Sequence, residues 1–110
     1  MKKILYFISA IIFISCASTK PVAPTTADVE RGKSTYPNLT LDAANAGKMN
    51  FEQQCSKCHG LKKASSKTAE QWQKIVPGMA AKAEKKAGKV VIDQATQESI
   101  LHYLVAMAKH

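Results

Sequence analysis

Cys55-Ser56-Lys57-Cys58-His59 is the stretch that determines what this chain folds around. Two thiols separated by two residues, with an imidazole directly after the second thiol, form the C-x-x-C-H pattern of covalent haem attachment. In that chemistry the two sulfurs add to the vinyl groups of the haem, and the histidine binds the iron from one side. The pattern therefore predicts one c-type haem on Cys55 and Cys58, with His59 as an iron ligand.

Two other uses of a closely spaced cysteine pair fit the sequence less well. A structural zinc site needs four ligands, and only His102 and His110 could join the motif, without a second cysteine pair. A thioredoxin-like redox pair needs a βαβ context, which the helical pattern of this chain does not provide. Haem attachment is therefore the favoured interpretation.

Residues 1–15 have the layout of an export signal, because Lys2 and Lys3 precede an apolar run over 4–14. The run is shorter than the roughly 20 apolar residues that a spanning helix needs. A permanent transmembrane helix is therefore the weaker alternative, and we expect these residues to be absent from the folded domain.

Cys16 follows the apolar run directly and is preceded by a small residue, Ser15. This arrangement resembles the lipobox of bacterial lipoproteins, which implies that Cys16 becomes the lipidated first residue of the mature protein. Several acyl chains on one cysteine meet the requirement for stable anchoring. The resemblance implies a lipoprotein of the bacterial cell envelope, in the periplasm or on the outer surface. Cleavage nearby, for instance after Ala17, would leave a soluble protein instead.

The exported chain is basic. Without Lys2 and Lys3 it keeps 14 basic residues against 8 acidic ones, for a net charge of +6. That balance suits nucleic acid, an anionic membrane surface or an acidic protein partner, and export argues against nucleic acid. Lysines flanking the motif and the helix after it could steer an acidic redox partner or simply form a solvated face. They are Lys57, Lys62, Lys63, Lys67 and Lys74.

Residues 16–40 contain three prolines, many Ser and Thr, and no apolar periodicity. This composition predicts a lipidated N-terminus followed by a disordered linker. The folded domain is expected over 41–110. An apolar core alone is marginal for a domain of about 70 residues, and a bound cofactor commonly stabilises one of that size.

Helical patterns in this domain predict an all-α fold of three to four helices around the haem. A first helix is expected over 42–58, capped by Thr40 or Asp42. A second helix begins at Ser66 or Thr68, and Pro77 should kink or break it.

The last helix follows a short connection. Residues 80–86 can continue the second helix, and Gly88 ends it. Asp93 then caps the final helix, whose apolar stripe consists of Ile100, Tyr103, Leu104 and Met107.

With these helices and its C-x-x-C-H motif, the chain resembles the small, class I-like monohaem c-type cytochromes over most of 42–108. In that family a glycine and an aromatic residue four positions later on the first helix cross an aromatic residue of the last helix. Gly47, Phe51 and Tyr103 fit that pattern, with Gly47 allowing the helices to approach closely. The resemblance implies that Phe51, Trp72 and Tyr103 pack around the haem.

A subset of these cytochromes has a tryptophan followed seven residues later by a methionine that binds the iron. Trp72 and Met79 have that spacing, and the Ile-x-x-Tyr-Leu ending typical of the subset follows at 100–104. The resemblance implies Met79 as the sixth ligand. The other candidates are less well placed. Met49 shares the helix that carries the motif, and His102 should face solvent. Met107 and His110 lie near the C-terminus.

Iron with both axial positions filled has no open site for a substrate or for oxygen, which leaves one-electron exchange through the haem edge. The resemblance therefore implies a membrane-tethered electron carrier that is not an enzyme, with acidic redox proteins as partners. Two alternatives stay open. One is a haem enzyme or gas sensor with an open iron site, in which Met79 only packs. The other is a haem subunit of a larger membrane redox complex.

Overall fold

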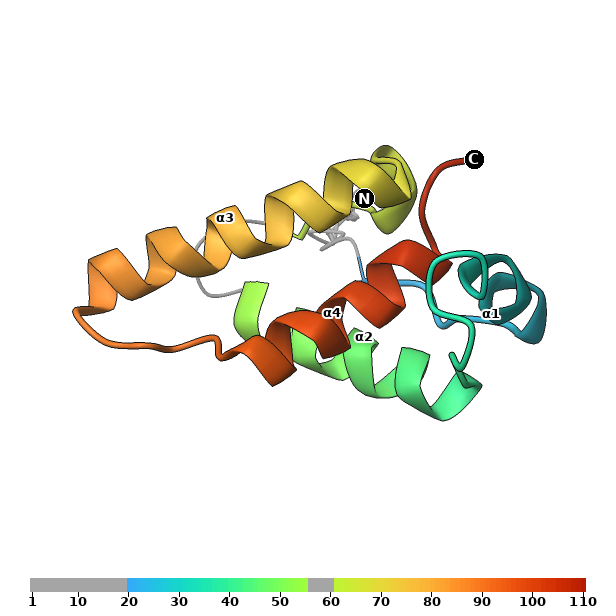
Figure 1. The fold of residues 1–110 in the computed structure, drawn as a ribbon, viewed down its shortest axis with the longest axis horizontal. Coiled ribbons are helices and arrows are strands. Elements are labelled where there is room, and N and C mark those ends of the chain that lie inside the picture. Colours follow the sequence, from blue (N-terminus) through green and yellow to red (C-terminus); the bar gives the residue numbers. More distant parts are fainter. Residues whose placement is uncertain (1–19, 56–60) are drawn as a thin grey trace, which may run out of the picture.

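A computed structural model describes residues 20–55 and 61–110 of the chain. These residues form helices and no named strand, which agrees with the predicted all-α class. None of the helices in the described ranges is long and apolar enough to cross a membrane. Figure 1 shows α3 running along one side of the molecule, with α2 and α4 next to each other below it. The elements are α1 Thr26–Gly32, α2 Leu41–Cys55, the short 3-10 helix η1 Ala64–Ser66, α3 Ala69–Ala87 and α4 Gln94–Ala106.

Helices α2 and α4 touch at Gly47. A Cβ atom on Gly47 would lie 2.0 Å from the carbonyl oxygen of Ser99 and 3.0 Å from the backbone nitrogen of Tyr103. Only a residue without a side chain fits there. Asn50 Nδ2 donates a hydrogen bond to Ser99 Oγ at 2.9 Å across the same contact. The close approach predicted for Gly47 is confirmed.

The main core lies between α2, α3 and α4. The stripe predicted on the last helix supplies its centre, since Ile100, Tyr103 and Leu104 are each 1% exposed. Met107, predicted on the same stripe, is only half-buried at the C-cap of α4. The buried members of this core are Phe51, Ala64, Trp72, Val76, Ile100, Tyr103, Leu104 and Ala108.

Helix α3 is fixed at both ends by the predicted caps. The Thr68 side chain accepts a hydrogen bond from the backbone N–H of Gln71. In return, the Gln71 side chain accepts a hydrogen bond from the backbone N–H of Thr68, which completes a capping box. At the other end Gly88 adopts a left-handed conformation with φ of 71°, and its N–H donates to the carbonyl of Glu84 at 2.8 Å.

Of the kink or break predicted at Pro77, the break is wrong, because α3 continues through this residue. Proline removes one backbone donor from the helix, whereas Val76 and Ala80 on either side of it are buried at 6% and 5% exposure. The burial of these two residues and the two helix caps outweigh the free-energy cost of the missing backbone hydrogen bond. The helix therefore presents one continuous face from its first turn to its last.

The prediction of a disordered linker is wrong for the described part of 16–40. Thr25 and Asp28 form a capping box that begins α1, and Arg31 pairs with the Asp28 carboxylate. A second core then joins this segment to the domain, because Val29 and Leu39 are buried against Ala44 and Ala106. A seven-residue helix with few apolar residues shows no periodicity, so its burial depends on distant residues that the local pattern does not reveal.

Replacing Gly47 by Ala is expected to lower the free energy of unfolding by about 1–3 kcal/mol, because the new methyl group forces α2 and α4 apart. Gly78→Ala is the matched control in α3. A Cβ there meets no atom of the described residues within 4 Å, and alanine favours a helix over glycine by up to about 1 kcal/mol. Thermal unfolding followed by circular dichroism should show the two melting temperatures moving in opposite directions. A Gly47→Ala protein as stable as its parent would contradict the close contact.

Candidate cofactor site

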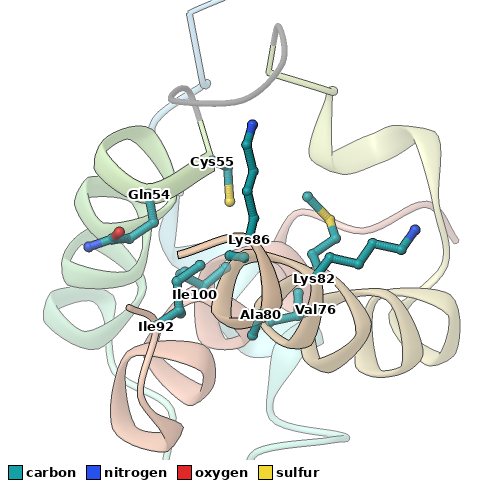
Figure 2. Close-up of a pocket in the computed structure, with 10 residues that line it drawn as sticks. Gln54, Cys55, Val76, Ala80, Lys82, Lys86, Ile92 and Ile100 are labelled. Carbon is teal, nitrogen blue, oxygen red and sulfur yellow. The ribbon is translucent and has the colours of Figure 1, made fainter. Parts of the chain in front are cut away.

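A cavity between α2, α3 and α4 brings two of the predicted site residues together. Cys55, the last residue of α2, and Met79, in the middle of α3, both line it. Figure 2 shows the Cys55 side chain at the end of α2, with its sulfur directed toward the other residues that line the cavity. The cavity has a volume of about 200 Å³ and is partly open to solvent.

The chemistry of the lining fits a haem. Most of the wall is apolar, as the flat faces of a porphyrin require, and its apolar members are Val76, Ala80, Ala83, Ile92 and Ile100. Lys82 and Lys86, one helical turn apart on α3, line the same cavity and supply cations for carboxylate groups. Cofactor sites typically enclose roughly 300–1,000 Å³, so the cavity of about 200 Å³ formed by the described residues is smaller than a typical cofactor site.

Met79 is 41% exposed and belongs to neither core cluster of the described residues. A methionine that only fills a core is usually buried among apolar neighbours. Met79 instead lies on the cavity wall, with its thioether free of that packing role. Met79 is therefore not core filler, and its role as an iron ligand stays a prediction.

The other candidate ligands lie elsewhere. Met49 is 59% exposed on α2 and does not line the cavity, and His110 is exposed near the C-terminus. His102 was predicted to face solvent, which is wrong, because it is half-buried with its ring edge-on to Tyr36 at a centroid distance of 4.7 Å. Among residues 20–55 and 61–110, no three His, Cys, Asp or Glu side chains gather to hold a metal ion.

The three aromatic residues predicted to pack around the haem are all buried. Trp72 is 2% exposed, and its Nε1–H donates to the carbonyl of Ala64 at 2.8 Å. The rings of Phe51 and Tyr103 lie 5.8 Å apart between centroids. Cys55 packs against the core cluster that contains all three. None of the three lines the cavity with Cys55 and Met79, so their contact with a haem stays a prediction.

Phe51 and Tyr103 line a second cavity instead, with a volume of about 320 Å³. It shares no lining residue with the first cavity. Met107, another candidate ligand, lies there and not beside Cys55. Two of the predicted docking lysines, Lys62 and Lys63, also line this second cavity.

Tyr103 joins the core to the N-terminal segment. Its hydroxyl donates a hydrogen bond to the carbonyl of Val22 at 2.8 Å. Burial, together with the negative charges of Glu52 and Asp28, raises the pKa of Tyr103 to about 12. For Asp28, burial tends to raise the pKa, but hydrogen bonds from Thr25 and the charge and hydrogen bond of Arg31 hold it below its ordinary value.

The predictions for Cys16, Cys58 and His59 lie outside the described residues. Lys82 and Lys86 line the cavity with Cys55 and Met79 but were not predicted as site residues. Helical periodicity carried on from Val76 would have found them, since positions three to four apart share a face. The expected interruption at Pro77 removed that signal.

Tyr103 should make the fold sensitive to alkali. Its pKa rises from 10.0 to about 12 on folding, so the neutral hydroxyl contributes its full stabilisation below pH 10, and this contribution is lost as the pH rises through 12. In urea denaturation at several pH values, the free energy of unfolding should fall more steeply over that window in the parent than in Tyr103→Phe. Parallel profiles for the two proteins would argue against a buried, hydrogen-bonded phenol.

No protein-family model matches the chain, and no curated protein or solved structure matches it either.

Proposed function

We propose that the protein is a membrane-tethered electron carrier with one c-type haem, bound covalently through Cys55 and Cys58. His59 and Met79 are the iron ligands in this proposal. The observation that supports it most is that Cys55 and Met79, on different helices, line the same largely apolar cavity. The C-x-x-C-H motif accounts for the first of these residues, and the Trp72–Met79 spacing accounts for the second.

When bound, a haem supplies one-electron exchange at its iron. The residues of the cavity determine the surroundings in which that exchange takes place. Val76, Ala80 and Ile100 exclude water from the wall, and an apolar, low-dielectric shell tunes the reduction potential of a metal site. The Met79 thioether raises the potential further, because it is a neutral, soft ligand. Together these residues suit a carrier of relatively high potential.

With His59 and Met79 as ligands, a bound haem would favour electron transfer over catalysis, because no iron site would remain for a substrate. The chain would then need a partner that approaches the cavity. Lys82 and Lys86 are exposed and line it, so they can steer an acidic redox protein into a small, transient interface. Anchoring through a lipid on Cys16 would keep this exchange at the surface of the bacterial cell envelope.

Covalent haem attachment is tested by expressing the full chain with a periplasmic haem-ligation system. Denaturing electrophoresis should give a haem-stained band that resists acid-acetone extraction, because thioether bonds survive denaturation. Cys55→Ala with Cys58→Ala should lose the stain, whereas Cys16→Ala should keep it as the matched cysteine control. Complete extraction of haem from the parent would rule out the covalent bond.

Ligation by Met79 is tested by absorption spectroscopy. The oxidised protein should be low-spin, with the weak far-red band of sulfur-to-iron coordination. Met79→Ala should lose that band, lower the reduction potential and let carbon monoxide bind the reduced protein, because a ligand position becomes free. Met49→Leu and Met107→Leu should keep the band. A parent that is already high-spin and binds carbon monoxide readily would favour a gas sensor or haem enzyme instead.

A further inference from the structure

Three lysines from two distant parts of the sequence line the second cavity. Lys20, Lys62 and Lys63 line it together, and all three are exposed. Its inner wall is formed by Phe51, Tyr103 and Met107, with no acidic residue among the described lining. We call these three lysines the lysine cluster.

The lysine cluster is not neutralised within the described residues. The ion pairs found there join other groups, namely Arg31 with Asp28, Lys33 with Glu30 and Lys48 with Glu52. Val22, which lines the same cavity, is an apolar side chain with 68% exposure. Unpaired cations beside an exposed apolar side chain are the combination that membrane interfaces attract.

The N-terminal segment is fixed to the domain at this same cavity. The Val22 carbonyl accepts the hydrogen bond of the buried Tyr103 hydroxyl. Beyond it, Pro24 is buried and α1 packs through Val29. Residues 21–40, which we call the strap, are therefore folded onto α2 and α4, and the point where the chain leaves the domain is set by the fold.

The strap shortens the distance between the domain and a lipid on Cys16. Lys20 lies only four positions after Cys16, and four extended residues span at most about 14 Å. A disordered linker to residue 40 would have allowed a reach of some tens of ångströms. The folded strap instead keeps the lysine cluster within reach of lipid headgroups.

We infer that the lysine cluster is a membrane-binding surface for anionic lipid headgroups, and that the strap holds the domain in one orientation on the bilayer. The orientation depends on the proposed lipid anchor, whereas the attraction of the lysines to anionic lipid does not. The lysines near Cys55 and Met79 line a different cavity, so they stay available to a redox protein while the cluster faces the membrane.

The attraction is tested without the anchor, using the haem-loaded Cys16→Ala chain after removal of residues 1–15, and sedimentation with vesicles. Vesicles of phosphatidylglycerol and phosphatidylcholine should bind the protein, whereas vesicles of phosphatidylcholine alone should not. Lys62→Glu with Lys63→Glu should weaken binding by at least 25-fold, at about fivefold for each lysine lost. The matched control, Lys85→Glu with Lys89→Glu, changes the net charge equally at two exposed lysines that line neither cavity, and it should bind nearly as the parent does. Equal losses in the two pairs would overturn the inference in favour of unspecific charge attraction.

The orientation is tested with the lipidated parent in anionic vesicles. A water-soluble amine reagent should modify Lys62 and Lys63 more slowly in vesicles than in detergent, while Lys82 and Lys86 react alike in both. If each of the four lysines reacted at the same rate in vesicles as in detergent, the fixed orientation would be overturned. Protection of Lys62 and Lys63 only on addition of an acidic protein would overturn it as well. Haem content and the absorption band of the same samples report on the proposed electron carrier separately, so the failure of either idea can be recognised.

Discussion

The contact between α2 and α4 at Gly47 determines the positions of the other site elements. Because the two helices meet without a side chain between them, Phe51 can lie against Tyr103 one turn further along α2. Cys55 follows another turn later at the helix end. Helix α4 then contributes to both cavities, with Ile100 in the first and Tyr103 in the second. A small shift at this contact would move the wall of both cavities at once.

Helix α3 closes the first cavity, and its position depends on Trp72. The indole is buried and donates a hydrogen bond to the carbonyl of Ala64, which joins the segment before the helix to the helix itself. From that fixed point an unbroken helix carries Met79 about two turns onward and Lys86 two turns beyond it. The C-terminal end of the chain also constrains the start of α3, because the Lys109 N–H donates a hydrogen bond to the carbonyl of Lys67 at 2.8 Å.

Local chemistry was sufficient to predict the features that depend on neighbours in sequence. Thr68, Gly88 and Asp93 act as caps because their side chains or backbone angles satisfy groups a few residues away. The strap could not be predicted in that way, since Leu39 is buried by Ala44 and Ala106 and not by its own neighbours. The continuity of α3 through Pro77 could not be predicted for the same reason, because the burial that maintains it is tertiary. The pairing of Cys55 with Met79 in one cavity agrees with the motif and the tryptophan spacing, whereas the lysines of that cavity required the three-dimensional arrangement.

The strap also has a consequence for the order of events during synthesis. The hydrogen bond from Tyr103 to Val22 joins residues 81 positions apart, and Ala106 in α4 completes the core that buries the strap. Synthesis from the N-terminus delivers the strap first and α4 last. Contacts over such separations form only after a large loop has closed. The strap therefore remains open until α4 has been made, and its burial is among the last steps of folding.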